Sequence, residues 1–133
     1  MNTKTKEKLL SQLLELPNEL FGQPATDEDI HLFEQQFGPI PESYKWVLKN
    51  CGKMIIGSDF TDDIIQLSES HKKFNAEKLI GNGWTLKDIF LIGWDGAGNP
   101  IGIEIQSGHI LIEYIGDAKT TVLLNSIDEI AKP

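Results

Sequence analysis

The chain has 133 residues, a formal net charge of −8 at pH 7 and 40% hydrophobic residues. This length suits a single globular domain with a substantial core, so we expect one domain over residues 1–133. The twelve basic residues are all lysine and face twenty acidic residues. Clustered Lys and Arg bind nucleic-acid phosphates, and this charge balance therefore argues against a direct nucleic-acid partner.

The cysteine content and hydropathy point to a cytoplasmic protein. Cys51 is the single cysteine, so an intrachain disulfide is excluded, which fits a reducing compartment. No apolar run approaches the ~20 residues that a membrane span needs, so we expect no membrane contact. The sequence does not indicate an oligomeric state.

Three helices are predicted in the first half. Leucines at helical spacing favour a helix over residues 3–16, ending before Pro17. A second helix should begin at Thr26 or Asp27 and stop at Gly38. A third, with Pro41 near its start, would bury Tyr44, Val47, Leu48 and Cys51 on one face. Cys51 is thus interpreted as a small buried apolar residue and not as a nucleophile.

The hydrophobic period then changes to two, which favours strands. Met54–Ile56 and Ile64–Leu67 are predicted strands, separated by an acidic loop over residues 57–63. A helix over residues 68–79 would be capped by Ser68 or Ser70. Near the end of the chain, Ser126 and Glu129 form a capping-box pattern that predicts a short helix from Ile127 to about Lys132.

A hairpin is predicted within residues 90–115, with Ser107-Gly108 as a two-residue turn. That turn would pair Ile105 with Ile110, Ile103 with Ile112 and Ile101 with Tyr114, all on the packed face. Glu104 and Glu113 would then lie on the opposite, partly solvated face. The expected fold class is α+β, with N-terminal helices packed on a mainly antiparallel sheet and a short C-terminal helix.

Residues 26–52 resemble the opening signature of the SUKH superfamily, which includes yeast cell-wall-synthesis regulators and bacterial immunity proteins. The residues that carry the resemblance are Thr26-Asp27-Glu28-Asp29-Ile30, Glu34, Gly38, Ile40-Pro41, Tyr44, Trp46–Leu48 and Asn50-Cys51-Gly52. Ile40 stands where the family usually has leucine, and Cys51 where it has the first glycine of a pair.

The second half is also similar to the family, with a Gly-rich turn at residues 93–99, a hairpin and a closing helix that begins at Ser126. The resemblance covers residues 26–131 and implies a non-catalytic module that binds a partner protein. Its leading implication is an immunity protein that neutralises the toxic domain of a polymorphic toxin such as a nuclease. The alternative is a regulatory or scaffold module that binds an endogenous protein, for example a cell-wall-synthesis factor.

No catalytic, metal or cofactor motif is found. His31, His71 and His109 lie in separate predicted elements, and none belongs to a recognisable motif. The Gly93–Asn99 segment leads into a strand and not into a helix, so a tight turn is favoured over a phosphate loop. We therefore expect no enzyme activity, no metal and no cofactor.

The candidate partner-binding residues are Asp59, Asp62, Asp63, Trp94, Asp95, Glu104 and Glu113. Such acids can form a solvated face that keeps the protein soluble, or they can offer carboxylates to the basic cleft of a toxin and speed encounter by long-range attraction. Both interpretations remain open. Trp94 is either an exposed binding anchor or a core residue.

Overall fold

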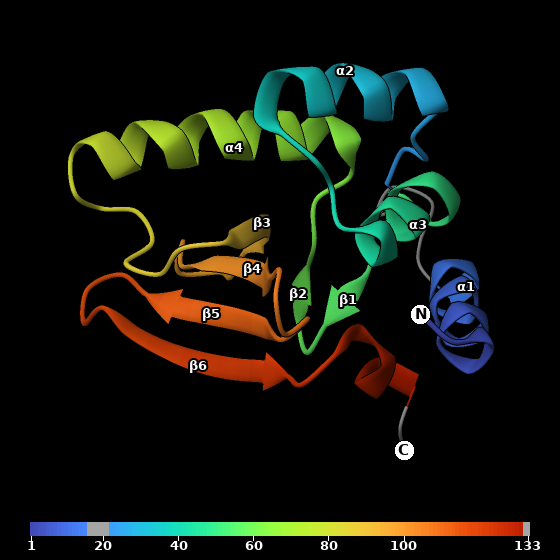
Figure 1. Cartoon of the computed structure of the whole chain (residues 1–133). Helices are drawn as coiled ribbons and strands as arrows, with labels where there is room; N and C mark the ends of the chain where they lie inside the picture. The colour runs from blue at the N-terminus through green and yellow to red at the C-terminus, as the bar shows by residue number, and fades with distance from the viewer. Residues whose placement is uncertain (16–21, 132–133) are drawn as a thin grey trace.

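Helices and antiparallel strands form separate parts of the computed structural model, which describes residues 1–15 and 22–131 (Figure 1). In chain order the elements are α1 (Thr3–Glu15), α2 (Asp27–Phe37), α3 (Glu42–Asn50), β1 (Ile55–Ile56), β2 (Asp59–Phe60), α4 (Ile64–Leu79), β3 (Ile89–Trp94), β4 (Pro100–Glu104), β5 (Ile110–Tyr114), β6 (Lys119–Leu124) and the 3-10 helix η2 (Ile127–Ala131). The predicted α+β class is confirmed. The helix ends predicted at Leu16 and Lys132 lie outside the described residues.

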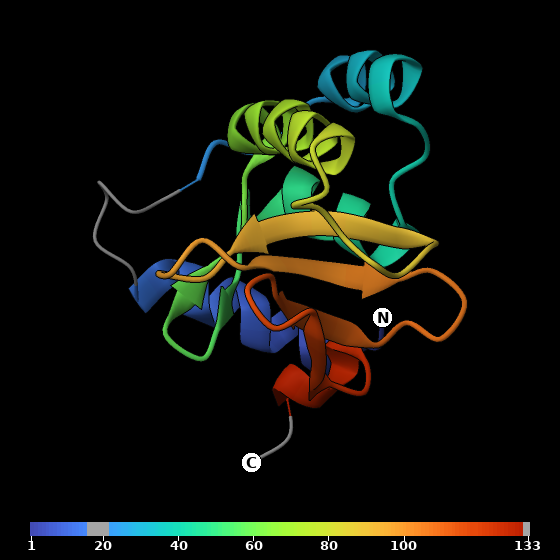
Figure 2. The ribbon, with the colours of Figure 1, turned by 90° about the vertical axis from the view of Figure 1, so that its left-hand side faces the viewer.

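The main sheet is a four-stranded antiparallel meander in the order β3-β4-β5-β6. Strands β1 and β2 form a separate two-stranded hairpin, which a bridge between Thr61 and Gly93 joins to the edge strand β3. Helix α4 runs along the β3 edge with α2 beside it, while α3 and α1 lie behind the inner face of the sheet (Figures 1 and 2). Two helices therefore lie along one edge of the sheet and two lie on its inner face.

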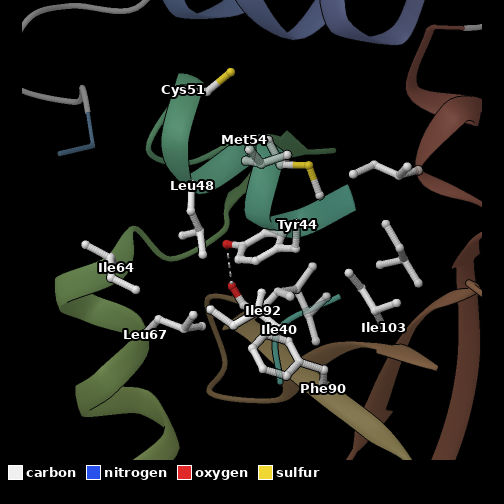
Figure 3. Close-up of a cluster of buried hydrophobic side chains, with 14 of the residues drawn as sticks. Ile40, Tyr44, Leu48, Cys51, Met54, Ile64, Leu67, Phe90, Ile92 and Ile103 are labelled. Atoms are coloured by element: carbon white, nitrogen blue, oxygen red, sulfur yellow. Dashed lines mark hydrogen bonds between the residues drawn. The ribbon is translucent and has the colours of Figure 1, made fainter. Parts of the chain in front are cut away.

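The core lies between the inner face of the sheet and the helices. Inner-facing side chains of three neighbouring strands fill it, namely Phe90, Ile92, Ile101, Ile103, Ile110 and Ile112. Tyr44 of α3 lies at its centre (Figure 3), where its hydroxyl donates a 2.5 Å hydrogen bond to the backbone carbonyl of Asp62 and lies 3.4 Å from that of Ile92. Burial raises the pKa of Tyr44, so the hydroxyl remains a donor.

The predicted helices of the first half are confirmed, and their caps explain their ends. Thr26 and Asp29 form a reciprocal capping box at the start of α2. Gly38 ends the helix with a φ of 103°, a conformation that glycine adopts without strain. Pro41 takes the N-cap position of α3 instead of its first turn.

The strand predicted at Ile64–Leu67 is wrong, because these residues form the first turn of α4. Asp63 is the N-cap of that helix. Its carboxylate accepts the backbone N–H of Gln66 at 2.9 Å, and the side-chain oxygen of Gln66 accepts the backbone N–H of Asp63 at 3.2 Å. The predicted caps Ser68 and Ser70 are therefore also wrong. A strong capping box at Asp63 outweighs the strand preference of a β-branched pair.

The predicted two-residue hairpin turn is wrong as well. Ile101 pairs with Ile112 and Ile103 with Ile110, so the register is shifted by two residues and residues 105–108 form the loop. A shift of two preserves the alternation of faces, and the four paired isoleucines are all buried as predicted. Ile105, however, is 57% exposed, because the strand ends before it.

The outer face is also less solvated than predicted. The connection from α4 to β3 crosses this face and packs Trp84 against Leu91 and Gly102. A Cβ added at Gly102 would lie 3.2 Å from the Trp84 indole. Glu113 beneath it is 0% exposed, and its carboxylate accepts the Thr85 hydroxyl at 2.6 Å and the Thr85 N–H at 3.1 Å. Its expected solvent exposure is therefore wrong.

The C-terminal element begins at Ile127 as predicted but is a tighter kind of helix. Residues 127–131 form a 3-10 helix. The Ser126 hydroxyl accepts the Asp128 N–H at 3.2 Å, and the Glu129 carboxylate accepts the Asn125 N–H. The serine hydroxyl of the predicted capping box thus bonds the amide of Asp128, one residue earlier than that pattern expects.

Two substitutions test the register. Ile103→Asp should unfold the domain, because it places an unpaired charge in the core at a cost of roughly 3 kcal/mol or more. Ile105→Asp should change stability by less than about 1 kcal/mol, because its side chain reaches solvent. Thermal melts of both variants measure this. Equal destabilisation would contradict the observed loop.

The cap of α4 gives a second test. Asp63→Ala should lower the free energy of unfolding by about 1–2 kcal/mol, since it removes an N-cap. Ser68→Ala is the matched control, because among the described residues its hydroxyl bonds the Ile64 carbonyl of the same helix and no other group. Urea unfolding of the two variants should rank them in this order, and a larger loss at Ser68 would contradict the cap assignment.

Candidate partner-binding site

The seven predicted site residues do not form one surface. Asp62, Asp63 and Glu113 are buried, whereas Asp59, Trp94, Asp95 and Glu104 are partly exposed. Asp95 follows the end of β3 that pairs with Pro100, and Glu104 pairs with Ile89 at the opposite end of that ladder. The structure therefore separates the acids that remain accessible.

Asp63 has a structural role. Besides capping α4, its carboxylate accepts the backbone N–H of Gln23 at 3.0 Å. Both oxygens are thus used to join the start of α4 to the segment before α2. A partner could reach this carboxylate only by displacing those bonds.

Asp62 is a buried acid with a perturbed pKa. Burial raises the pKa of its carboxyl to about 6, against opposing effects from the Ser70 hydroxyl and the Lys53 charge. The Ser70 hydroxyl donates to this carboxylate at 2.5 Å. Asp62 is therefore held inside by a single side-chain donor, beside the equally buried Asp63.

Trp94 is neither a fully exposed anchor nor a core residue, the two alternatives that the sequence left open. Its ring is half-buried against Phe74, with ring centroids 6.1 Å apart, and its indole N–H donates to the Ser70 hydroxyl at 2.9 Å. The Lys73 ammonium lies 4.5 Å from the ring centroid. Trp94, Ser70 and Asp62 thus form a continuous hydrogen-bonded chain from the surface to the buried carboxyl.

Asp95 closes the β3–β4 turn. The predicted tight turn at residues 93–99 is confirmed for residues 95–99, whereas Gly93 and Trp94 belong to β3. Its carboxylate accepts the N–H groups of Ala97 and Asn99 at 2.9 and 2.8 Å and the Asn99 side-chain amide at 3.0 Å. Partial burial acts to raise the pKa of Asp95, but these donors outweigh it and hold that pKa below its ordinary value.

Asp59 and Glu104 are the candidate acids least committed to the fold. Asp59 lies in the short strand β2 and is partly exposed. Glu104 accepts a 2.5 Å bond from the Ser107 hydroxyl at the β4–β5 loop. These two carboxylates are therefore the ones that charge-reversal experiments can address without removing a buried bond.

Cys51 and His71 are held in surroundings that disfavour their reactive forms. Burial raises the pKa of the Cys51 thiol to about 11, which disfavours the reactive thiolate. Burial lowers the pKa of His71, whose Nε2 lies 2.9 Å from the Leu91 carbonyl while its ring packs between Phe33 and Phe90. In residues 1–15 and 22–131 no group of three His, Cys, Asp or Glu side chains could hold a metal ion.

Sequence reasoning missed three hollows of the surface. One, of about 370 Å³, lies beside Trp46 and is flanked by Lys45 and Lys49 of α3. A second, of about 230 Å³, is lined by His71 and aromatic rings. A third, of about 210 Å³, lies between α2 and α4 and exposes Leu32 and Ile65. Leu32 lies outside the buried Ile30/Phe33 stripe of its helix, and this position in the sequence pattern could have predicted its exposure.

The fold and site define a small α+β domain in which buried acids hold loops and helix ends in place. The chain belongs to the SMI1/KNR4 family (SUKH-1), whose family model matches residues 24–132. Members of this family are known as toxin-immunity proteins or regulators and are generally non-catalytic, so protein–protein interaction is the general mode of action. No curated protein matches the chain. None of the described helices is long and apolar enough to cross a membrane.

The perturbed pKa of Asp62 predicts a pH-dependent stability. Because the folded pKa is about 6 and the reference value is 3.8, the folded state holds this proton more tightly than the unfolded chain. The stabilisation is complete below about pH 3.8 and is lost as pH rises through 6, by about 3 kcal/mol in total.

Asp62→Asn removes this titration and preserves an oxygen that can accept the Ser70 hydroxyl. Relative to this variant, the wild type should lose stability as the pH rises from about 3.8 to 6, with little further change above about pH 7. Urea unfolding of both proteins across that range measures the difference. Parallel stability curves would contradict a raised pKa at Asp62.

Proposed function

We propose that this chain is an immunity protein that binds and neutralises the toxic domain of a polymorphic toxin with a basic active-site cleft, such as a nuclease. The observation that carries the proposal is the family match over residues 24–132, which covers nearly the whole fold. Blocking requires a rigid, complementary surface and no chemistry of its own.

The placement of the titratable groups supports a binding role. The most deeply buried acids serve backbone and hydroxyl donors, and Cys51 is held as a thiol. Asp59, Asp95 and Glu104, with Trp94, are the candidate residues that remain accessible, and we propose that they assist partner binding.

The charge of the molecule suits a basic partner. A net charge of −8 in a chain of 133 residues creates a long-range field that attracts cations and accelerates their encounter. The active-site cleft of a nuclease is lined with Lys and Arg, because it binds phosphates. An acidic inhibitor therefore approaches such a cleft faster than a neutral one of equal size.

The test uses a toxic domain whose gene lies next to that of this chain, where such a gene is found. Co-expression of the chain should protect cells from that domain. Association measured on a surface should slow by about tenfold or more between low salt and ~0.5 M salt, where the Debye length falls to about 4 Å. The dissociation rate should change less.

Charge variants separate this field from simple solubility. The pair Asp59→Lys with Glu104→Lys should slow association by about an order of magnitude, while Asp59→Asn with Glu104→Gln should have an intermediate effect. Melting curves confirm that each variant folds. Full protection by the reversed variants together with a salt-independent association rate would mean that the acids serve only solubility.

The regulator branch of the family supplies the competing function. Under that alternative the chain would bind an endogenous protein and would not protect against any toxin encoded nearby. Flanking genes without a toxin, together with failed protection, would move the assignment to a regulatory scaffold.

A further inference from the structure

We propose that the groove between α2 and α4 is where a basic segment of the toxin-domain partner docks, with an aliphatic or aromatic anchor inserted between Leu32 and Ile65. This inference rests on the proposed function and specifies its contact surface. The groove holds about 210 Å³ and is walled by Asp29 and Leu32 of α2 and by Ile65 and Ser68 of α4.

The groove exposes an apolar pair above a buried apolar floor. Leu32 is 55% exposed and Ile65 is 56% exposed, and they line the same hollow from opposite helices. Phe33 and Ile64 below them are buried and also line the hollow. A branched side chain placed here would contact apolar atoms on three sides, which is the setting in which interface anchors contribute most.

Free carboxylates flank this apolar pair. Glu28 lies one turn before Leu32 and Glu69 one turn after Ile65, so each acid shares a helix face with one member of the pair. Both acids are exposed, and neither has an ion pair with a described residue. Other acids of α2 are occupied: Asp27 bonds Lys49 at 2.6 Å and Glu34 lies 3.4 Å from Lys45.

The local sequence carries little positive charge to oppose these acids. Helix α2 contains no Lys, and the first lysine of α4 is Lys72, one turn beyond Ser68. The rim of the groove therefore selects for Lys or Arg on a partner segment, and its centre for an apolar side chain.

The other apolar or hollow surfaces fit a basic partner less well. Leu79 and Ile80 are exposed at the end of α4 but follow Lys78. The His71 hollow is also bordered by Lys78. Beside Trp46, Lys45 and Lys49 already pair with acids of α2.

The candidate residues near Trp94 lie on a different side of α4. Ser70 and Lys73, which contact Trp94, project from another face of the helix than Ile65 and Ser68, which line the groove. Contact at the groove therefore leaves Asp59 and Asp95 to act through the long-range field.

The first arm of the test measures binding of the full chain to the toxic domain encoded beside it. Leu32→Ser and Ile65→Ser should each weaken affinity by at least about tenfold through faster dissociation. Leu79→Ser and Ile80→Ser are matched controls, because they remove exposed aliphatic groups elsewhere, and they should change affinity less than about twofold. Leu32→Ala provides a milder variant should the serine variant fold poorly.

Charge location is tested in the same assay. Glu28→Lys with Glu69→Lys should slow association more than Asp117→Lys with Glu7→Lys, two exposed acids outside the groove that give the same change in net charge. Equal slowing by the two pairs would show that only net charge matters and would overturn the groove as the contact surface.

A second arm does not need the toxin. A synthetic amphipathic peptide of about 16 residues, made of Lys, Leu and Ala, should shift the backbone NMR signals of Leu32, Ile65 and Ser68 more than those of Leu79 and Ile80. An analogue with Glu in place of Lys should not. Shifts spread evenly over the molecule would overturn the inference.

The two arms distinguish the two levels of the argument. A wild-type chain that neither binds nor protects against the toxic domain defeats the proposed function, while the peptide still decides whether the groove takes a basic segment. A wild-type chain that protects, with Leu32→Ser and Ile65→Ser indistinguishable from their controls, keeps the function and defeats the groove.

Discussion

The backbone of residues 61–63 is the junction on which the arrangement of the other elements depends. The Asp62 N–H donates to the Ile92 carbonyl of β3 at 2.8 Å, and its own carbonyl accepts the Tyr44 hydroxyl of α3. Asp63 caps α4 and accepts the Gln23 N–H. This short segment therefore fixes the sheet edge, α3, the start of α4 and the entry to α2 relative to one another. The burial of two adjacent acids is the energetic cost of that junction.

Much of the fold could be predicted because its periods are strong. The helical stripes of α1 to α3 and the isoleucines of β4 and β5 were recognisable from spacing alone. The length of the loop at residues 105–108 could not be predicted, because a shift of two residues still leaves the isoleucines of β4 and β5 on the inner face. The change to a hydrophobic period of two predicts a strand at residues 64–67, although the Asp63–Gln66 spacing carries the correct signal for a helix start.

The candidate site was less predictable, because composition counts charges without showing which of them are solvated. Glu113 is buried only because Thr85 and Trp84, nearly thirty positions earlier, cover the outer face of the sheet. Asp62 and Asp63 look like members of an acidic surface loop until the donors from Ser70 and Gln23 are known. The exposure of Ile65 likewise depends on the spacing between α2 and α4, which no local sequence pattern determines.

Helix α1 lies outside the residues that the family model matches, yet it is part of the folded body. Its Leu9 is buried in the core, and its Thr5 hydroxyl donates to the Asp128 carboxylate at 2.8 Å, next to a 2.9 Å bond from the Asn2 N–H to the same carboxylate. The first and last described elements therefore meet at Asp128. Under tension applied to the two ends, these bonds would carry the load before the sheet does. Because these two elements lie close together, a short linker could join them. A circularly permuted chain with new termini in an exposed loop would then keep the same core.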